Sequence, residues 1–135
     1  MIYKFLDHTA DVKFQAFGKT MEECFKHAAY AMKEVIAGKL DVKPKMIKTI
    51  EISAKDKEAL LYKFIEEFLF LLDAESFLLS KIDSIKIEDN KLKMEVSGDE
   101  AHKYEFSNDV KAVTYNSMFI KKVKEKYVCQ IVLDV

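Results

Sequence analysis

Residues 60–72 read Leu-Leu-Tyr-Lys-Phe-Ile-Glu-Glu-Phe-Leu-Phe-Leu-Leu, the most hydrophobic segment of the chain. The spacing predicts a helix that starts near Asp56, and its apolar arc is too wide for a helix with a single buried side. We therefore expect a central helix that is covered on more than one side and belongs to the core. The members of the arc are Leu60, Leu61, Phe64, Ile65, Phe68, Leu69, Leu71 and Leu72.

A second amphipathic helix is predicted nearer the N-terminus. Thr20 and Glu23 form a capping box, apolar residues then recur at helical spacing, and Gly38 ends the pattern. After Pro44, the alternation of apolar and polar residues through Ala54 predicts a strand.

The chain from Ser80 onward is predicted to consist of strands. A two-residue turn at Asp89-Asn90 would place Ile87 opposite Leu92 and Ile85 opposite Met94, so that the apolar residues share one face. Residues 98–108 are polar and irregular, which indicates a loop or a weak edge strand. A second hairpin is expected from 110–123 and 126–133, and its last strand is apolar on both faces, as in the interior of a sheet. We expect an α+β fold: a single domain over residues 1–135, with two helices packed on a mixed, mainly antiparallel sheet.

The charge balance argues against RNA binding as the main activity. The chain of 135 residues has 22 Lys plus Arg and 23 Asp plus Glu, for a formal net charge of -1. A protein that grips RNA phosphates is expected to carry an excess of basic residues. The local clusters at 43–45 and 121–124 could contact RNA, although a solvated loop or hairpin end is the favoured explanation for each.

The cysteines and the hydrophobic segments indicate a cytoplasmic protein. Cys24 and Cys129 have no metal-ligand spacing and are expected to be core thiols. The N-terminus has no long apolar run of the kind found in signal peptides. Lys63, Glu66 and Glu67 interrupt the most hydrophobic segment, so we expect no membrane span.

Chemical interest centres on Asp7-His8-Thr9-Ala10-Asp11, which lies between two short runs with strand character. Two carboxylates and one imidazole within five residues are more functional side chains than a turn between strands usually carries. A purely structural explanation is also available, because Asp and Thr side chains cap backbone N–H groups in turns.

Several segments together resemble one known family over the whole length of the chain. The segments are Leu6-Asp7-His8-Thr9-Ala10-Asp11-Val12, Gly18-Lys19-Thr20-Met21-Glu22-Glu23-Cys24-Phe25, Lys111-Ala112-Val113-Thr114-Tyr115 and the final Val132-Leu133-Asp134-Val135. They closely resemble the archease family, and they occur in the family's order from Tyr3 to the last residue. The resemblance implies a protein cofactor without catalytic activity of its own. Its partner would be the GTP-dependent RNA ligase of tRNA splicing and RNA repair, and contact with tRNA would be indirect, through that ligase.

The resemblance also implies a metal site. Asp11, Asp134 and the terminal residue Val135 would share a divalent ion, with calcium as the expected ion, because hard cations prefer carboxylate and main-chain oxygens. His8 and Asp7 would orient the turn or face a partner protein. The sequence alone does not bring the two ends of the chain together, and without the resemblance Asp134 could be a solvated terminal residue and Asp11 a turn cap.

The match to the family departs at two positions, and other functions stay open. Lys13 stands where a small residue is common and Asn116 where His is common, which leaves the hydrogen bonds behind the site in question. A chaperone-like interaction module for RNA-modifying enzymes would use the same fold without the metal. A weak metal-dependent phosphohydrolase is a third reading, although the chain has no GxSxG sequence, Walker-type glycine loop or paired-His metal motif.

Overall fold

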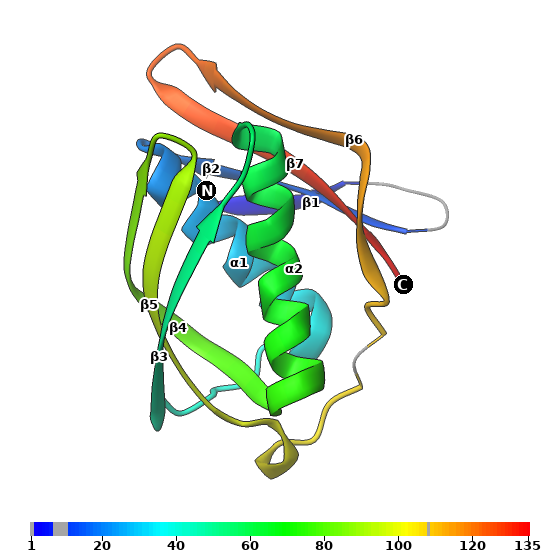
Figure 1. Ribbon diagram of the computed structural model, residues 1–135. Helices are drawn as coiled ribbons and strands as arrows, with labels where there is room; N and C mark the ends of the chain where they lie inside the picture. Colours follow the sequence, from blue (N-terminus) through cyan, green and yellow to red (C-terminus); the bar gives the residue numbers. More distant parts are fainter. Residues whose placement is uncertain (1, 7–10, 108) are drawn as a thin grey trace.

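The part of the chain that the structure describes contains two α-helices, one short 3-10 helix and seven strands. The computed structural model describes residues 2–6, 11–107 and 109–135. The elements, drawn in Figure 1, are β1 (Tyr3–Leu6), β2 (Val12–Gly18), α1 (Met21–Ala37), β3 (Met46–Ser53), α2 (Lys57–Glu75), β4 (Phe77–Glu88), β5 (Lys91–Glu100), the short 3-10 helix η1 (Ala101–Lys103), β6 (Ala112–Val123) and β7 (Lys126–Asp134).

The strands form two sheets. One has four strands in the order β1-β2-β7-β6, and the other has three in the order β3-β5-β4. Every strand pairing within the described residues is antiparallel. The predicted α+β class with a mainly antiparallel strand arrangement is confirmed, although the strands form two sheets and not one mixed sheet.

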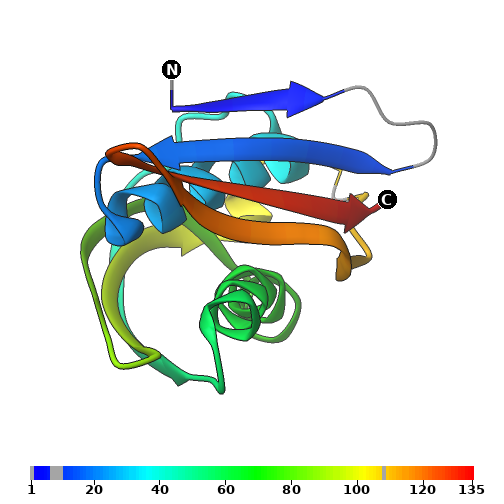
Figure 2. The same ribbon diagram turned by 90° about the horizontal axis from the view of Figure 1, so that it is seen from above.

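Helix α2 is the central helix, as its wide apolar arc predicts. It begins at the N-cap Asp56, whose carboxylate accepts a hydrogen bond of 2.8 Å from the Ala59 N–H. The whole arc from Leu60 to Leu72 is buried. Seen from above, α2 lies in the concave side of the curved three-stranded sheet and next to β6 of the other sheet (Figure 2).

Helix α1 fills the space between the two sheets and α2. Thr20 accepts a hydrogen bond of 3.1 Å from the Glu23 N–H, and the Glu23 carboxylate accepts one of 3.2 Å from the Lys19 N–H. The helix ends where Gly38 takes a positive φ of 66° and donates its N–H to the Glu34 carbonyl. Both predicted ends are confirmed, because capping signals are local.

The register predicted for the hairpin of β4 and β5 is confirmed. Asp89 and Asn90 have φ values of 51° and 59°, the left-handed pair of a two-residue hairpin turn. Ile87 pairs with Leu92, and Ile85 pairs with Met94. Strand β7 lies between β2 and β6, in the interior of its sheet as predicted.

The loop or weak edge strand predicted for residues 98–108 is wrong for residues 98–100, which belong to β5, the middle strand of its sheet. Strand β5 continues to Glu100 and pairs there with Phe77, so β4 also begins before Ser80. Asp99 is a buried strand residue whose carboxylate is satisfied by polar partners. A polar strand of this kind has the same sequence pattern as a loop.

The two cysteines are core thiols, as predicted. Cys24 and Cys129 are fully buried, and the Cys24 thiol donates a hydrogen bond of 3.4 Å to the Ala16 carbonyl. The hydrogen bond with Cys24, followed by burial, raises the pKa of the Cys129 thiol well above its usual value.

Candidate functional site

The pairing of β2 with β7 brings the two ends of the chain to one edge of the four-stranded sheet. The strands are antiparallel, and Val12 pairs with Leu133. Asp11 immediately precedes Val12, and Asp134 immediately follows Leu133. Both views show the C-terminus beside the start of β2 (Figures 1 and 2). Two carboxylate residues that are 123 positions apart in the sequence are therefore neighbours at this edge, which we call the acidic edge (Asp11, Asp134 and Val135).

Strand β6 fixes the acidic edge from the other side. Ala112 pairs with Asp134, and the Lys111 N–H donates a hydrogen bond of 2.7 Å to the Asp134 main-chain carbonyl. The half-buried Val135 packs against the hydrophobic core. The main chain around Asp134 is thus held in place while the Asp134 residue itself is exposed.

The donor set at the acidic edge consists of oxygens. Two Asp carboxylates and the main-chain oxygen of Val135 suit calcium or magnesium, and they suit zinc poorly because zinc favours nitrogen and sulfur ligands. Within residues 2–6, 11–107 and 109–135, no three His, Cys, Asp or Glu residues come together in a way that could hold a metal ion. Calcium takes roughly six to eight oxygens, so an ion at this edge would need further ligands from water, from a partner or from residues beyond the described ranges.

Asp7 and His8 lie outside the described residues. Their expected roles, orientation of the turn or contact with a partner, therefore stay predictions. In the sequence they fall between β1 and β2, and the pairing of these two strands runs as far as Leu6 with Lys13. Lys13, one of the two departures from the family pattern, also pairs with Val132 of β7.

A wide bulge in β6 was not predicted. Thr114 pairs with Val132 and Phe119 with Gln130, so four residues of β6 stand against one of β7. The Gln130 side-chain amide donates a hydrogen bond of 2.8 Å to the Ser117 carbonyl, and its oxygen accepts one of 2.9 Å from the Gln15 side chain. The buried glutamine within an otherwise apolar strand is the signal that sequence reasoning could have used.

The second departure from the family pattern, Asn116, lies within this bulge. Asn116 is exposed, and its N–H donates a hydrogen bond of 2.8 Å to the Thr114 hydroxyl. Ser117 adopts a positive φ of 59°. Bulges of this kind redirect side chains and are frequent near functional sites.

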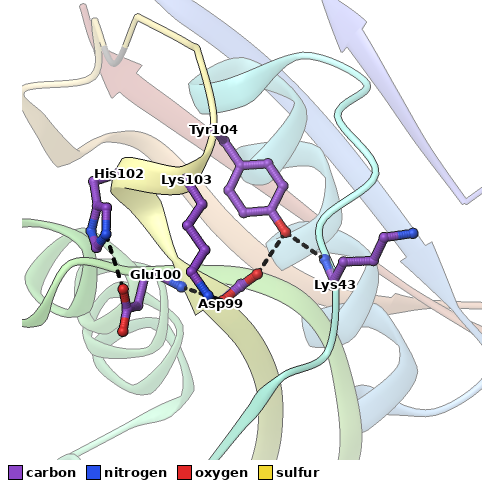
Figure 3. Close-up of polar contacts among 6 residues, drawn as sticks. All are labelled: Lys43, Asp99, Glu100, His102, Lys103 and Tyr104. Atoms are coloured by element: carbon purple, nitrogen blue, oxygen red, sulfur yellow. Dashed lines mark hydrogen bonds and ion pairs between the residues drawn. The ribbon is translucent and has the colours of Figure 1, made fainter.

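A second polar cluster surrounds the end of β5 (Figure 3). Asp99 is buried, and its carboxylate accepts hydrogen bonds from the Glu100 N–H at 2.8 Å and the Tyr104 hydroxyl at 2.9 Å. Lys103 approaches the same carboxylate at 3.4 Å. The Tyr104 hydroxyl accepts a hydrogen bond of 2.9 Å from the Lys43 N–H, so the cluster ties β5 to the loop before β3.

The cluster serves structure more than chemistry. Burial alone would raise the pKa of Asp99, but the hydrogen bonds from Glu100, Tyr104 and Lys103, together with the charge of Lys103, outweigh it and lower the pKa. A carboxylate that is ionised and fully hydrogen-bonded is a poor general base. We therefore assign the candidate site to the acidic edge.

Comparison with known proteins gives a consistent result over the full chain. The model of the Archease protein family matches residues 3–135. The protein archease of Pyrobaculum calidifontis is 38% identical over 139 residues, which cover 98% of this chain and 95% of that protein. The protein archease of Methanosarcina barkeri is 34% identical, with the same coverage.

Two solved structures share the fold. A solution structure of a Methanobacterium thermoautotrophicum protein superposes with a TM-score of 0.84 at 34% identity and covers 99% of both chains. The crystal structure of a Thermotoga maritima archease, described as a "possible chaperone", has a TM-score of 0.67 at 19% identity and covers 98% of this chain and 96% of the other. With a family model that matches nearly every residue and relatives of more than 30% identity along the whole length, the chain belongs to the archease protein family.

Proposed function

We propose that this protein activates the GTP-dependent RNA ligase of tRNA splicing and RNA repair, and that its acidic edge carries the activity. The protein would promote transfer of GMP to the ligase and allow repeated turnover. Membership of the archease family supports the choice of the RNA ligase as the partner. The observation that supports the site is the register of β2 with β7, because it makes neighbours of Asp11 and Asp134.

A divalent cation, for which calcium is our expectation, would be held by Asp11, Asp134 and Val135. The fit rests on the donors: all are hard oxygens, and the Asp134 main chain is already fixed by Lys111. When bound, such an ion would supply positive charge next to the phosphates of the nucleotide. The residues of this chain would position the ion and present it at an exposed edge.

The distribution of charge fits a role beside the RNA-bound enzyme. The basic residues Lys121, Lys122 and Lys124 lie at the hairpin end of β6 and β7, where Lys122 pairs with Tyr127. Asp134 is at the opposite end of the same strand pair. An edge with a local excess of carboxylates is poorly suited to hold RNA, so contact with tRNA is proposed to pass through the ligase.

The proposed place of action is the cytoplasm. Among the described residues, neither helix combines the length and the apolar character that crossing a lipid bilayer would require. Membrane association is not part of the proposal.

The test is multiple-turnover ligation of a cleaved tRNA by the cognate ligase, with this protein at a substoichiometric amount. We expect the wild-type protein to raise the number of turnovers. The Asp134→Ala variant should raise it little or not at all. Asp41→Ala, an exposed carboxylate in the loop after α1, is the matched control and should activate normally. Failure of the correctly folded wild-type protein to activate would contradict the proposal.

A chaperone-like interaction module is the second candidate. The observation in its favour is the description of the Thermotoga maritima structure as a "possible chaperone". This function would need the fold but not the acidic edge. Full activity of both Asp11→Ala and Asp134→Ala, with the fold intact, would favour it.

A further inference from the structure

The solvent-facing side of α2 carries aromatic residues in an unusual position. Phe70 is 54% exposed, although every other Phe and Leu of the helix is buried. Tyr62 and Glu66 lie two and one turns before Phe70 at i, i+4 spacing, so the three side chains are neighbours along one stripe. The apolar arc of α2 accounts for its buried side but not for this exposed one.

The stripe continues across to the β6 bulge. The Tyr62 ring stacks on the Tyr115 ring, with centroids 4.1 Å apart and planes 3° from parallel. Tyr115 is 55% exposed. Tyr115 is three residues along β6 from Ala112, the partner of Asp134, or about 10 Å at the usual rise of a strand. We call Tyr62, Glu66, Phe70 and Tyr115 the aromatic stripe.

The aromatic stripe and the helix beside it are acidic. Glu66 and Asp73 are exposed, and Glu67 is half-buried beside them. Burial, followed by the negative charges of Glu75 and Glu66, raises the pKa of Glu67. The lysine in this part of the helix, Lys63, directs its amine to the Ser53 carbonyl at 2.9 Å. A cationic partner would relieve the repulsion among these carboxylates.

We propose that the aromatic stripe is the surface on which the ligase docks, through a basic face that carries Arg or Lys side chains. The inference rests on the proposed function and adds the contact surface to it. An enzyme that binds RNA must present cationic side chains for the phosphates, so its surface is complementary to an acidic one. Exposed aromatic rings supply the anchors that protein interfaces favour, and Arg stacks on such rings. Docking there would place the acidic edge within reach of the enzyme, because Asp134 pairs with Ala112, three residues before Tyr115 on β6.

The experiment separates binding from activation. Binding of the labelled chain to the ligase is measured for Phe70→Ser and Glu66→Lys, and activation of ligation is then titrated with each variant. We expect at least a tenfold increase in Kd for each variant, and recovery of activation at high concentration because the acidic edge is intact. Asp134→Ala should bind like the wild type and fail to activate at any concentration.

The controls are matched in chemistry and lie on the three-stranded sheet. Ile47→Ser removes an apolar side chain that is 66% exposed on β3, and Glu95→Lys reverses an exposed charge on β5. Both should leave Kd unchanged. If Phe70→Ser and Glu66→Lys bind like the wild type while Asp134→Ala loses activation, the docking surface is wrong and the proposed function stands. If the wild-type chain neither binds nor activates the ligase, the proposed function is wrong and the docking inference is overturned with it.

Discussion

At the scale of single residues, Asp134 combines a fixed main chain with an exposed carboxylate. Lys111 holds its carbonyl and Ala112 pairs with it, so removing the side-chain charge should leave the strand unchanged. A residue with this combination can be altered without unfolding the protein. Its function can therefore be tested directly.

If the proposed metal site is correct, Asp134→Asn and Asp11→Asn are each expected to weaken calcium binding at least tenfold, because each replaces a proposed carboxylate ligand with a neutral amide. Asp134→Asn should change the free energy of unfolding by no more than about 0.5 kcal/mol, as is usual for exposed positions. Titration calorimetry with calcium and thermal melts of the same samples measure both quantities. Asp41→Asn is the control. An unchanged calcium affinity in both Asp11→Asn and Asp134→Asn would contradict the proposed metal site.

Asp99 makes a separate prediction about pH. Its pKa is lower in the folded chain than the usual value of 3.8, so folding favours the ionised form. The resulting stabilisation is fully present above pH 3.8 and is lost as the pH falls toward the lower folded value.

Asp99→Asn should therefore be less stable than the wild type at neutral pH, with a difference that shrinks as the solution is acidified below pH 3.8. Urea unfolding at several pH values measures this difference. A difference that stays constant down to pH 2 would show that the charge of Asp99 contributes nothing, and that only its shape matters.

At the scale of elements, β5 passes very close to β4. A Cβ atom on Gly98 would collide with the Leu78 carbonyl oxygen and lie 2.6 Å from the Phe77 ring. Neither neighbour can move freely, because Leu78 and Phe77 belong to the buried start of β4. This position requires glycine for space.

Gly98→Ala is expected to destabilise the protein by about 1–3 kcal/mol, the usual cost of overpacking a core. Gly38→Ala is the comparison: nothing lies within 4 Å of its added Cβ, so its cost comes from the positive φ of 66° alone. Denaturant midpoints measure both. Wild-type stability of Gly98→Ala would show that β4 and β5 separate easily at this point.

Elements that rest on local signals could be predicted from the sequence, while elements that rest on distant contacts could not. The hairpin at Asp89-Asn90 follows from turn chemistry and from apolar residues that alternate on both sides. The pairing of β2 with β7 joins residues more than 100 positions apart, and β7 is apolar on both faces, so its pattern selects no partner. The polar stretch around Asp99 predicts a loop or a weak edge strand, because the sequence does not show that Tyr104 and Lys103, from beyond the strand, satisfy a buried Asp99.

At the scale of the whole molecule, charge is balanced in total but not in space. The acidic edge and the basic hairpin end lie at opposite ends of β6 and β7, and Glu66, Glu67 and Asp73 add further carboxylates along α2. The net charge of -1 conceals this separation. Sequence resemblance could name Asp11 and Asp134, but only the folded chain brings them together and shows the stripe beside them.

This separation of charge predicts that ligase binding depends on salt. Association through exposed charges should weaken as ionic strength rises from about 0.05 to 0.5 M, because screening shortens the range of the interaction. Glu66→Lys should bind weakly and show a smaller dependence on salt. Binding of the wild-type chain that is independent of salt would contradict an electrostatic contribution to docking.

The most direct test of the central claim is the formation of the covalent ligase–GMP species from labelled GTP, measured with and without this protein in the presence of calcium. We predict that the wild-type chain increases the amount formed, and that Asp11→Asn and Asp134→Asn do not, although both are folded and both bind the ligase. Equal stimulation by the wild type and the two variants would contradict the claim that the acidic edge carries the activity.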